Sequence, residues 1–285
     1  MLEKVFSEDT QTIESVKKFN GILGRILFFN NAPILPVHIP FARPYAGQKA
    51  ITDLRPEDPH FSHVIRGEWT LLAFAEEHKL DYGVFTDRDI FKGGKVFDAD
   101  IVVFNLHSEY WSNEMLAALH EYIAKGGKVV FSGGNNIYQK IRYNQYGMEL
   151  IEPYTAKKIS PIIGTFFSEQ SYPMFSSYKV KNKDHWIFRD TGVKNGEKFG
   201  AVSLNHRHEE KINGASGWEA DQTNEYSKGF EVLASGTNKT GAAHMVLQNT
   251  GNGGWIFNAS SIPFTGAIFT DKVVSKIMLN LLTYK

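Results

Sequence analysis

The chain has 285 residues, 42% of them hydrophobic, and its 31 Lys and Arg side chains balance its 31 Asp and Glu side chains. Such a composition is that of a globular protein, and the zero net charge gives no support for a nucleic-acid or anionic-membrane partner. The chain contains no cysteine, which excludes disulfides, thiolate zinc ligands and a cysteine nucleophile. Its start has no basic region before an apolar run, so we expect a cytoplasmic protein without a membrane span.

The amino-terminal third carries weak patterns. Residues 1–40 begin with a helical repeat and continue into a short apolar segment, and they predict no role. Prolines and glycines dominate up to residue 63, which indicates an ordered irregular loop. We then expect an amphipathic helix from Trp69 to His78, a strand from Tyr82 to Phe85, and an exit loop from Thr86 to Asp89.

The strongest pattern lies between residues 98 and 138. Ile101 to Leu106 is apolar at almost every position, as expected for a parallel strand buried on both faces. Ser112 can cap a following helix, which Gly126 and Gly127 end, and Val129 to Phe131 forms a second buried strand. A strand–helix–strand unit brings both strand ends to the same edge, so the polar loops after them lie where open α/β sheets bind ligands.

The rest of the chain changes character and then returns. Residues 154–253 contain short alternating runs, typical of a β-rich region. A strand at residues 254–258 and a helix from about Asp271 then resume the α/β pattern. We therefore predict an α/β domain of residues 41–153 and 254–285, a three-layer sandwich with a mostly parallel sheet, that carries residues 154–253 as a β-rich insertion.

Polar residues follow both central strands. His107 and Glu109 come directly after the first, and an ionisable pair at this edge is expected to have shifted pKa values. The alternative is a surface loop in which Glu109 caps a helix end. Asn135 follows two glycines, which let backbone approach a ligand closely but also make a common turn. Ser132 follows a strand, but its surroundings lack the first glycine of a nucleophile elbow, so we predict no serine hydrolase.

Six short motifs occur in an order that resembles one family. They are Arg43-Pro44-Tyr45, Tyr82 with Thr86 to Asp89, His107 to Ser112, Gly133-Gly134-Asn135, Gly217 to Asp221, and Ser260-Ser261. The order is similar to that in the carboxyl-terminal domain of the N,N-dimethylformamidase large (beta) subunit and its relatives, from about Phe41 onward. Residues 1–40 contain no counterpart of the Tyr-Asn and Gly-Gly rich motif that members usually carry upstream.

The resemblance implies a fold, a reaction and a metal. It implies a sheet like that of the class I glutamine amidotransferases, close to a flavodoxin-like fold, and hydrolysis of a formamide carbon–nitrogen bond at one iron ion held by two tyrosines and a carboxylate. Glu109 is then the carboxylate ligand, and the candidate phenolates are Tyr45, Tyr82 and Tyr110. A tyrosine among apolar neighbours is otherwise a core residue with a hydrogen-bonded hydroxyl.

The candidate catalytic residues are His107 and Asn135, from their positions after the two strands, and Glu219, which the resemblance implies. We predict that Glu219 lies beside His107, hydrogen-bonds its imidazole and raises its pKa, because a carboxylate stabilises the imidazolium. The alternative is that Glu219 and Asp221 are solvated turn residues and that Trp218 anchors the β-rich region.

Three classes of function remain open at this stage. The first is a hydrolase of non-peptide amides that uses a metal-activated water, with iron as cofactor and a small-molecule amide as substrate. The second is a non-catalytic domain that binds a saccharide or peptide, and the third is a structural subunit completed by a second copy or another chain. Metal analysis separates the first class from the other two.

Overall fold

The computed structural model describes residues 38–40, 63–145, 147–168, 174–205 and 214–284. The chain divides into two compact units, residues 1–51 with 141–151 and residues 52–140 with 152–285. In the first unit β6 (Gly147–Leu150) pairs antiparallel with β1 (His38–Pro40) and with residues 141–143 of β5 (Gln139–Tyr143). Most of the irregular loop expected before residue 63 lies outside the described residues.

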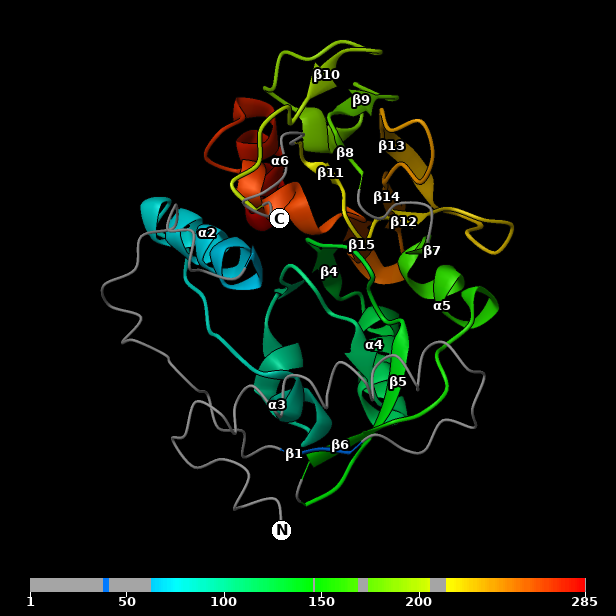
Figure 1. Cartoon of the computed structure of the whole chain (residues 1–285). Coiled ribbons are helices and arrows are strands. Elements are labelled where there is room, and N and C mark those ends of the chain that lie inside the picture. Colours follow the sequence, from blue (N-terminus) through cyan, green and yellow to red (C-terminus); the bar gives the residue numbers. More distant parts are fainter. Residues whose placement is uncertain (1–37, 41–62, 146, 169–173, 206–213, 285) are drawn as a thin grey trace, which may run out of the picture. The chain divides into compact units, whose positions relative to one another are not determined.

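The second unit is built on one sheet of seven strands in the order β10-β9-β13-β14-β15-β4-β2 (Figure 1). Only the neighbours β15, β4 and β2 are parallel, and every other pairing is antiparallel. The strands of the sheet are β2 (Ile101–Phe104), β4 (Lys128–Phe131), β9 (Tyr178–Val180), β10 (Lys198–Phe199), β13 (Glu231–Gly236), β14 (His244–Asn249) and β15 (Trp255–Asn258).

The predicted fold class is therefore wrong. A mostly parallel three-layer sandwich of the glutamine amidotransferase or flavodoxin type is not what the chain forms, because the sheet is mixed and its antiparallel part comes from residues 178–249. The apolar runs correctly marked the parallel strands. They carried no information about β14, which pairs with the other edge of β15 and extends the sheet into the β-rich region. The division into an α/β domain and an insertion stays a prediction.

Two of the longer helices begin at residues whose side chains cap them. The Ser112 hydroxyl accepts a hydrogen bond from the Met115 amide, as expected from the sequence. Asp271, where a helix was expected to begin, accepts from the amides of Val273 and Val274. The α-helices are α2 (His63–Glu77), α3 (Asp87–Phe91), α4 (Asn113–Ala124), α5 (Ala156–Ile163) and α6 (Lys272–Thr283). Short 3-10 turns are η2 (Lys95–Asp98), η4 (Trp186–Phe188), η5 (Gly251–Gly253) and η6 (Ile262–Ala267). No helix in the described part of the chain combines the length and apolarity needed to cross a bilayer.

One expected strand is absent from its place. Tyr82 to Phe85 is neither strand nor helix, and Val84 is 69% exposed. Directly after it the carboxylate of Asp89 accepts hydrogen bonds from the amide and the hydroxyl of Thr86. These bonds cap α3, which starts at Asp87, where the sequence had indicated an exit loop.

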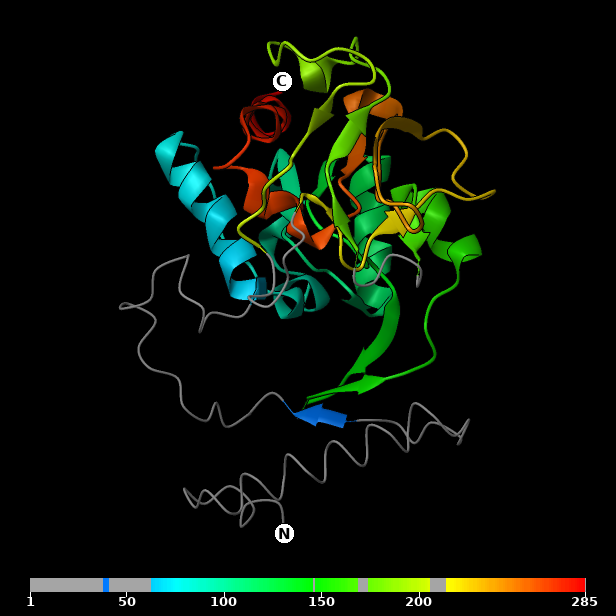
Figure 2. The ribbon, with the colours of Figure 1, turned by 45° about the horizontal axis from the view of Figure 1, so that its top comes forward.

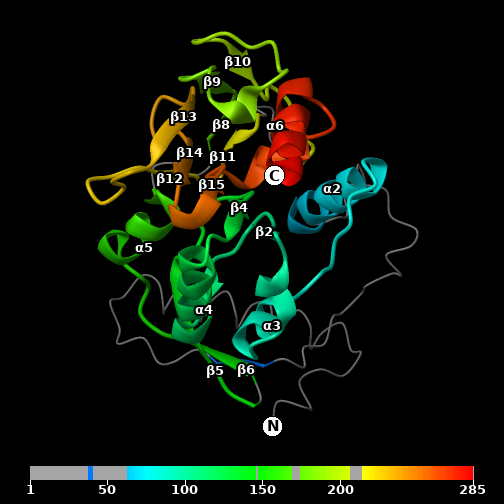
Figure 3. The same cartoon turned by 180° about the vertical axis from the view of Figure 1, so that it is seen from behind.

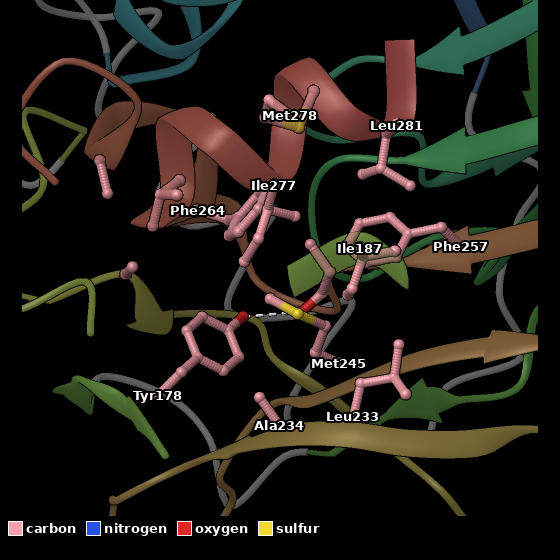
Figure 4. Packing of buried hydrophobic residues seen from close by; sticks show 14 of the residues in the cluster. Tyr178, Ile187, Leu233, Ala234, Met245, Phe257, Phe264, Ile277, Met278 and Leu281 are labelled. Atoms are coloured by element: carbon pink, nitrogen blue, oxygen red, sulfur yellow. Dashed lines mark hydrogen bonds between the residues drawn. The ribbon is translucent and has the colours of Figure 1, made fainter. Parts of the chain in front are cut away.

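Alternating residues of the central strands bury two faces. Trp255, Phe257 and Val130 pack in one cluster with Ile277 and Leu281 of α6. Figure 4 shows Phe257, Ile277 and Leu281 of this cluster. Figures 2 and 3 show α2 beside α6, with α4 and α5 on the other side of β15 and β4. Full burial of each large apolar side chain stabilises the fold by about 1.5–3 kcal/mol, so this core holds the strand ends that carry the site.

On the other face Phe104 and Phe131 stack with ring centres 4.8 Å apart, and both rings contact Trp111. These aromatic contacts tie the end of β2, the end of β4 and the start of α4 together. On the face that packs against α6, Tyr178 of β9 links its strand to the residue after β15, because its buried hydroxyl donates a hydrogen bond to the Ala259 carbonyl at 2.7 Å. Burial raises the pKa of Tyr178, so the phenol stays protonated.

Two short ladders hold the segment around residue 219. β11 (Ser216–Gly217) pairs antiparallel with β8 (Phe175–Ser176), and β12 (Asp221–Gln222) pairs antiparallel with β7 (Phe166–Phe167). A separate pair, β3 (Tyr110–Trp111) with the first two residues of β5, is parallel. The ladders fix the chain on both sides of Trp218, Glu219 and Ala220.

Candidate functional site

The loops after β2 and β4 meet at His107. The His107 Nδ1 lies 3.2 Å from the Gly134 carbonyl oxygen, which accepts the proton of that nitrogen and leaves Nε2 for other partners. The approach is possible because Gly133 has no side chain, since a Cβ there would lie 1.3 Å from the Leu106 carbonyl oxygen. The two predicted polar loops therefore do come together at the carboxyl edge of the parallel strands.

Two carboxylates surround the other ring nitrogen. The His107 Nε2 lies 3.2 Å from an oxygen of Glu109 and 3.6 Å from an oxygen of Glu219, and the side chains are 20%, 17% and 26% exposed respectively. The predicted proximity of Glu219 to His107 is confirmed. The direct hydrogen bond, however, runs to Glu109, which accepts from Nε2 when the ring is protonated, because 3.6 Å is too long for one to Glu219. The cluster of His107, Glu109 and Glu219 is partly buried and still reaches solvent.

The environment raises the pKa of His107. Burial acts against this and favours the neutral ring, but the hydrogen bond to Glu109, the charges of Glu219 and Glu109, and the Gly134 carbonyl together outweigh it. An imidazole with a raised pKa is a stronger proton acceptor, and its protonated form is held by two neighbouring negative charges. The arrangement suits a group that takes up and returns a proton.

Asn135 joins the cluster from the loop after β4. Its side-chain nitrogen donates to the Glu219 carboxylate at 3.2 Å. Its side-chain oxygen is buried and has no hydrogen-bond partner among the described residues. A buried acceptor without a donor is costly, so this atom marks a position where a bound N–H or O–H group would be stabilised.

Backbone strain gathers around these side chains. Leu106, Asn135, Trp218 and Glu219 have φ angles of 66°, 52°, 36° and 53°, in the left-handed region that side chains disfavour. Each such residue costs on the order of 1–3 kcal/mol, and clusters of them occur at functional sites, where surrounding structure holds the conformation. Trp218 supplies part of that support, because its ring is buried with Leu106, Phe175 and Ile262.

The candidate metal ligands do not all lie here. Tyr45 is outside the described residues. The Tyr82 side chain is 42% exposed and its hydroxyl donates to Glu76 at 2.7 Å, and Tyr110 is half-buried in β3 beside Glu109 in sequence. No group of three or more His, Asp or Glu side chains in the described part of the chain is placed to hold a metal ion. The described residues thus supply only part of the ligand set that the family resemblance implies.

Sequence reasoning missed the support beneath the site. Asp221, interpreted as a possible solvated turn residue, is fully buried. Its carboxylate accepts a hydrogen bond from the Asn135 amide at 2.8 Å. Asn136 and Asn258 are also buried and hydrogen-bonded to each other at 3.3 Å. Asp221, Asn136 and Asn258 lie far apart in the sequence and therefore form no local pattern. In the sequence, only the Ser260-Ser261 motif marked the turn after β15. Ser132, set aside as a nucleophile, accepts a hydrogen bond from the Leu106 amide.

Comparison with known proteins gives one family. A search of the curated proteins finds no match. A solved structure, a cytoplasmic protein from Salmonella typhimurium, is similar with a TM-score of 0.45 and 10% identity, over 88% of this chain and 95% of that one. The family model described as N,N-dimethylformamidase beta subunit-like, C-terminal, matches residues 28–159 and 152–273. Because these matches cover well over half of the sequence, the chain belongs to the N,N-dimethylformamidase beta subunit-like C-terminal family.

Proposed function

We propose that the chain hydrolyses the carbon–nitrogen bond of a small amide of the formamide type. The observation that supports this most is the position of His107 Nε2, 3.2 Å from Glu109 and 3.6 Å from Glu219 at the carboxyl edge of parallel strands. Family membership supports the same reaction class. The proposed roles are a proton carrier for His107, charge stabilisation for Glu109 and Glu219, and substrate contact for Asn135.

The reaction needs a proton to move twice. Neutral His107 takes a proton at Nε2 from a water molecule as the water oxygen bonds to the amide carbon. The imidazolium then gives this proton to the amide nitrogen as the carbon–nitrogen bond breaks, which yields a carboxylic acid and an amine. Glu109 and Glu219 stabilise the imidazolium between the two transfers, and the bond from Nδ1 to the Gly134 carbonyl keeps the ring oriented.

Asn135 suits the role of substrate contact. Its buried side-chain oxygen needs a donor, which an amide N–H or the attacking water would provide. Glu219 fixes the orientation of the Asn135 side chain by accepting from its nitrogen. Iron remains a prediction of the family resemblance, with Glu109 as the carboxylate that would hold it, and no step above depends on it.

The direct test is amine release by the purified chain. We would incubate it with formamide, N,N-dimethylformamide and acetamide, measure ammonia or dimethylamine, and determine iron by elemental analysis on the same sample. His107→Gln should lower kcat by about 10²–10⁴-fold because general acid–base catalysis contributes that factor. The control is His120→Gln, since His120 is exposed on α4 outside the cluster. Release of amine from none of these amides, or equal kcat in both variants, would contradict the proposal.

A further inference from the structure

Asp221 joins two loops that are distant in sequence. Besides the bond from the Asn135 amide to its Oδ1, its Oδ2 lies 3.4 Å from both the backbone and the side-chain nitrogen of Asn136. These donors lie 85 and 86 positions earlier in the chain. Asp221 is fully buried, so water does not compete for its oxygens. The carboxylate of Asp221, in β12, therefore holds the loop after β4 through hydrogen bonds.

Asp221 is itself held in place. Its amide donates to the Ser260 carbonyl at 2.9 Å, and in the β12–β7 ladder it pairs with Phe167. Gly134 reinforces the same junction, because its backbone passes so close to Glu219 that a Cβ would lie 2.1 Å from the Glu219 carbonyl oxygen. The two loops thus meet with little room for adjustment.

The connections form a closed ring. The Asp221 carboxylate holds the Asn135 backbone, the Asn135 side chain donates to the Glu219 carboxylate, and the chain returns from Glu219 to Asp221. Glu219 and Asn135 both have left-handed backbone conformations, which require support from their surroundings. Within this ring Asp221 is the member that is fully buried, and the proposed reaction gives it no contact with substrate and no part in the proton transfers.

We propose that Asp221 is a positioning residue that locks the loop bearing Asn135 and the loop bearing Glu219 into one arrangement around His107. The catalytic consequence rests on the hydrolase function proposed above. Loss of the lock would displace Asn135 and Glu219 without removing either side chain. A misplacement of about 1 Å can lower a rate by about 10²-fold, so the effect belongs to kcat more than to KM.

The test variant is Asp221→Asn, which keeps the shape and turns one acceptor oxygen into an amide nitrogen facing the Asn136 donors. We expect kcat for amide hydrolysis to fall about 10²-fold and KM to change less than about 3-fold. Amide hydrogen exchange at Asn135 and Asn136, followed by NMR at about pH 8, where the Asp221 carboxyl is ionised, should become at least about 10-fold faster, because a lost charge-assisted hydrogen bond of about 1.5 kcal/mol or more corresponds to that factor. Exchange in β4 should not change.

The matched control is Asp271→Asn. Asp271 is likewise a carboxylate that accepts from three N–H groups, here the backbone amides of Gly200, Val273 and Val274, but it caps α6 away from the cluster. Its replacement should speed exchange at Val273 and Val274 and leave kcat per folded molecule within about 2-fold of the wild type.

Several results would overturn the inference. If the Asp221→Asn protein keeps the wild-type kcat, or if its Asn135 amide exchanges hydrogen as slowly as in the wild type, Asp221 does not position the two loops. If Asp221→Asn does not fold, Asn136→Ala, which removes one donor to the same carboxylate, must still lower kcat and speed exchange at Asn135. If the wild type releases no amine, the hydrolase proposal fails, whereas the exchange measurements still decide whether Asp221 ties the two loops.

Discussion

At the scale of single residues, the two carboxylates beside His107 have different neighbours. Glu109 hydrogen-bonds the imidazole, and Glu219 adds charge and holds Asn135. We predict that Glu219→Gln lowers the His107 pKa, because one stabilising negative charge is lost, and reduces kcat about 10-fold, less than loss of His107 itself, because Glu109 still stabilises the imidazolium. NMR titration of histidine and steady-state kinetics would check this, with exposed Glu121→Gln as control. Loss of bound iron from the variant would mean that Glu219 is a ligand.

Asp221 should leave a signature in the pH dependence of stability. Burial raises its pKa from 3.8 to about 7, against the opposing hydrogen bonds from Asn135 and Asn136 and the charge of His107. The folded protein therefore keeps a proton that the unfolded chain has lost between about pH 4 and 7. The resulting contribution to stability is fully present below pH 4, decreases by up to about 1.4 kcal/mol per pH unit and is lost above pH 7.

Urea unfolding of the wild type and of Asp221→Asn at several pH values isolates that contribution. Asparagine does not titrate, so the wild-type free energy of unfolding should fall relative to that of the variant as the pH rises from 4 to 7. The other titrating groups that face Asp221, His107 and Tyr178, are present in both proteins and largely cancel in the difference. A difference that stays constant with pH would contradict the raised pKa.

At the scale of elements, the site depends on how closely two loops approach. Gly134→Ala would place a methyl group 2.1 Å from the Glu219 carbonyl oxygen, and backbone must move to admit it. We predict a loss of stability of about 1–3 kcal/mol, typical of overpacking, together with lower activity. Thermal unfolding and kinetics would test this against Gly251→Ala, where a Cβ meets nothing within 4 Å. Equal effects of the two substitutions would show that the close approach is unimportant.

Local signals predicted the elements that carry His107 and Asn135. The apolar runs became β2, β4 and β15, and Ser112 caps α4 as expected, because burial on both faces and capping leave marks within a few residues. The Tyr82 to Phe85 strand was wrong because apolar content alone does not supply a neighbouring strand. The antiparallel pairing of β14 with β15 was equally invisible, since strand pairing is set by tertiary contacts.

At the scale of the whole molecule, the site draws on segments that no local pattern connects. The family motifs named Glu219 as a partner for His107, and the structure places them 3.6 Å apart. Composition around residue 219 indicated only a loop. The burial of Asp221 could not be predicted from the sequence, because it follows from strand pairing with β7 and from contact with the turn after β15. Sequence thus predicts the residues of the candidate site better than the residues that hold them in place.

The parallel pairing of β15 with β4 has a consequence for the order of folding. The Asn135 side chain is hydrogen-bonded to Glu219, which lies 84 positions later in the sequence. The Asn136 side chain is hydrogen-bonded to that of Asn258, 122 positions later. Closing such long loops is entropically costly and slow, whereas β2 and β4 are joined by one local crossover. During refolding, recovery of function should therefore report the final docking of β15 rather than the first appearance of helix or sheet.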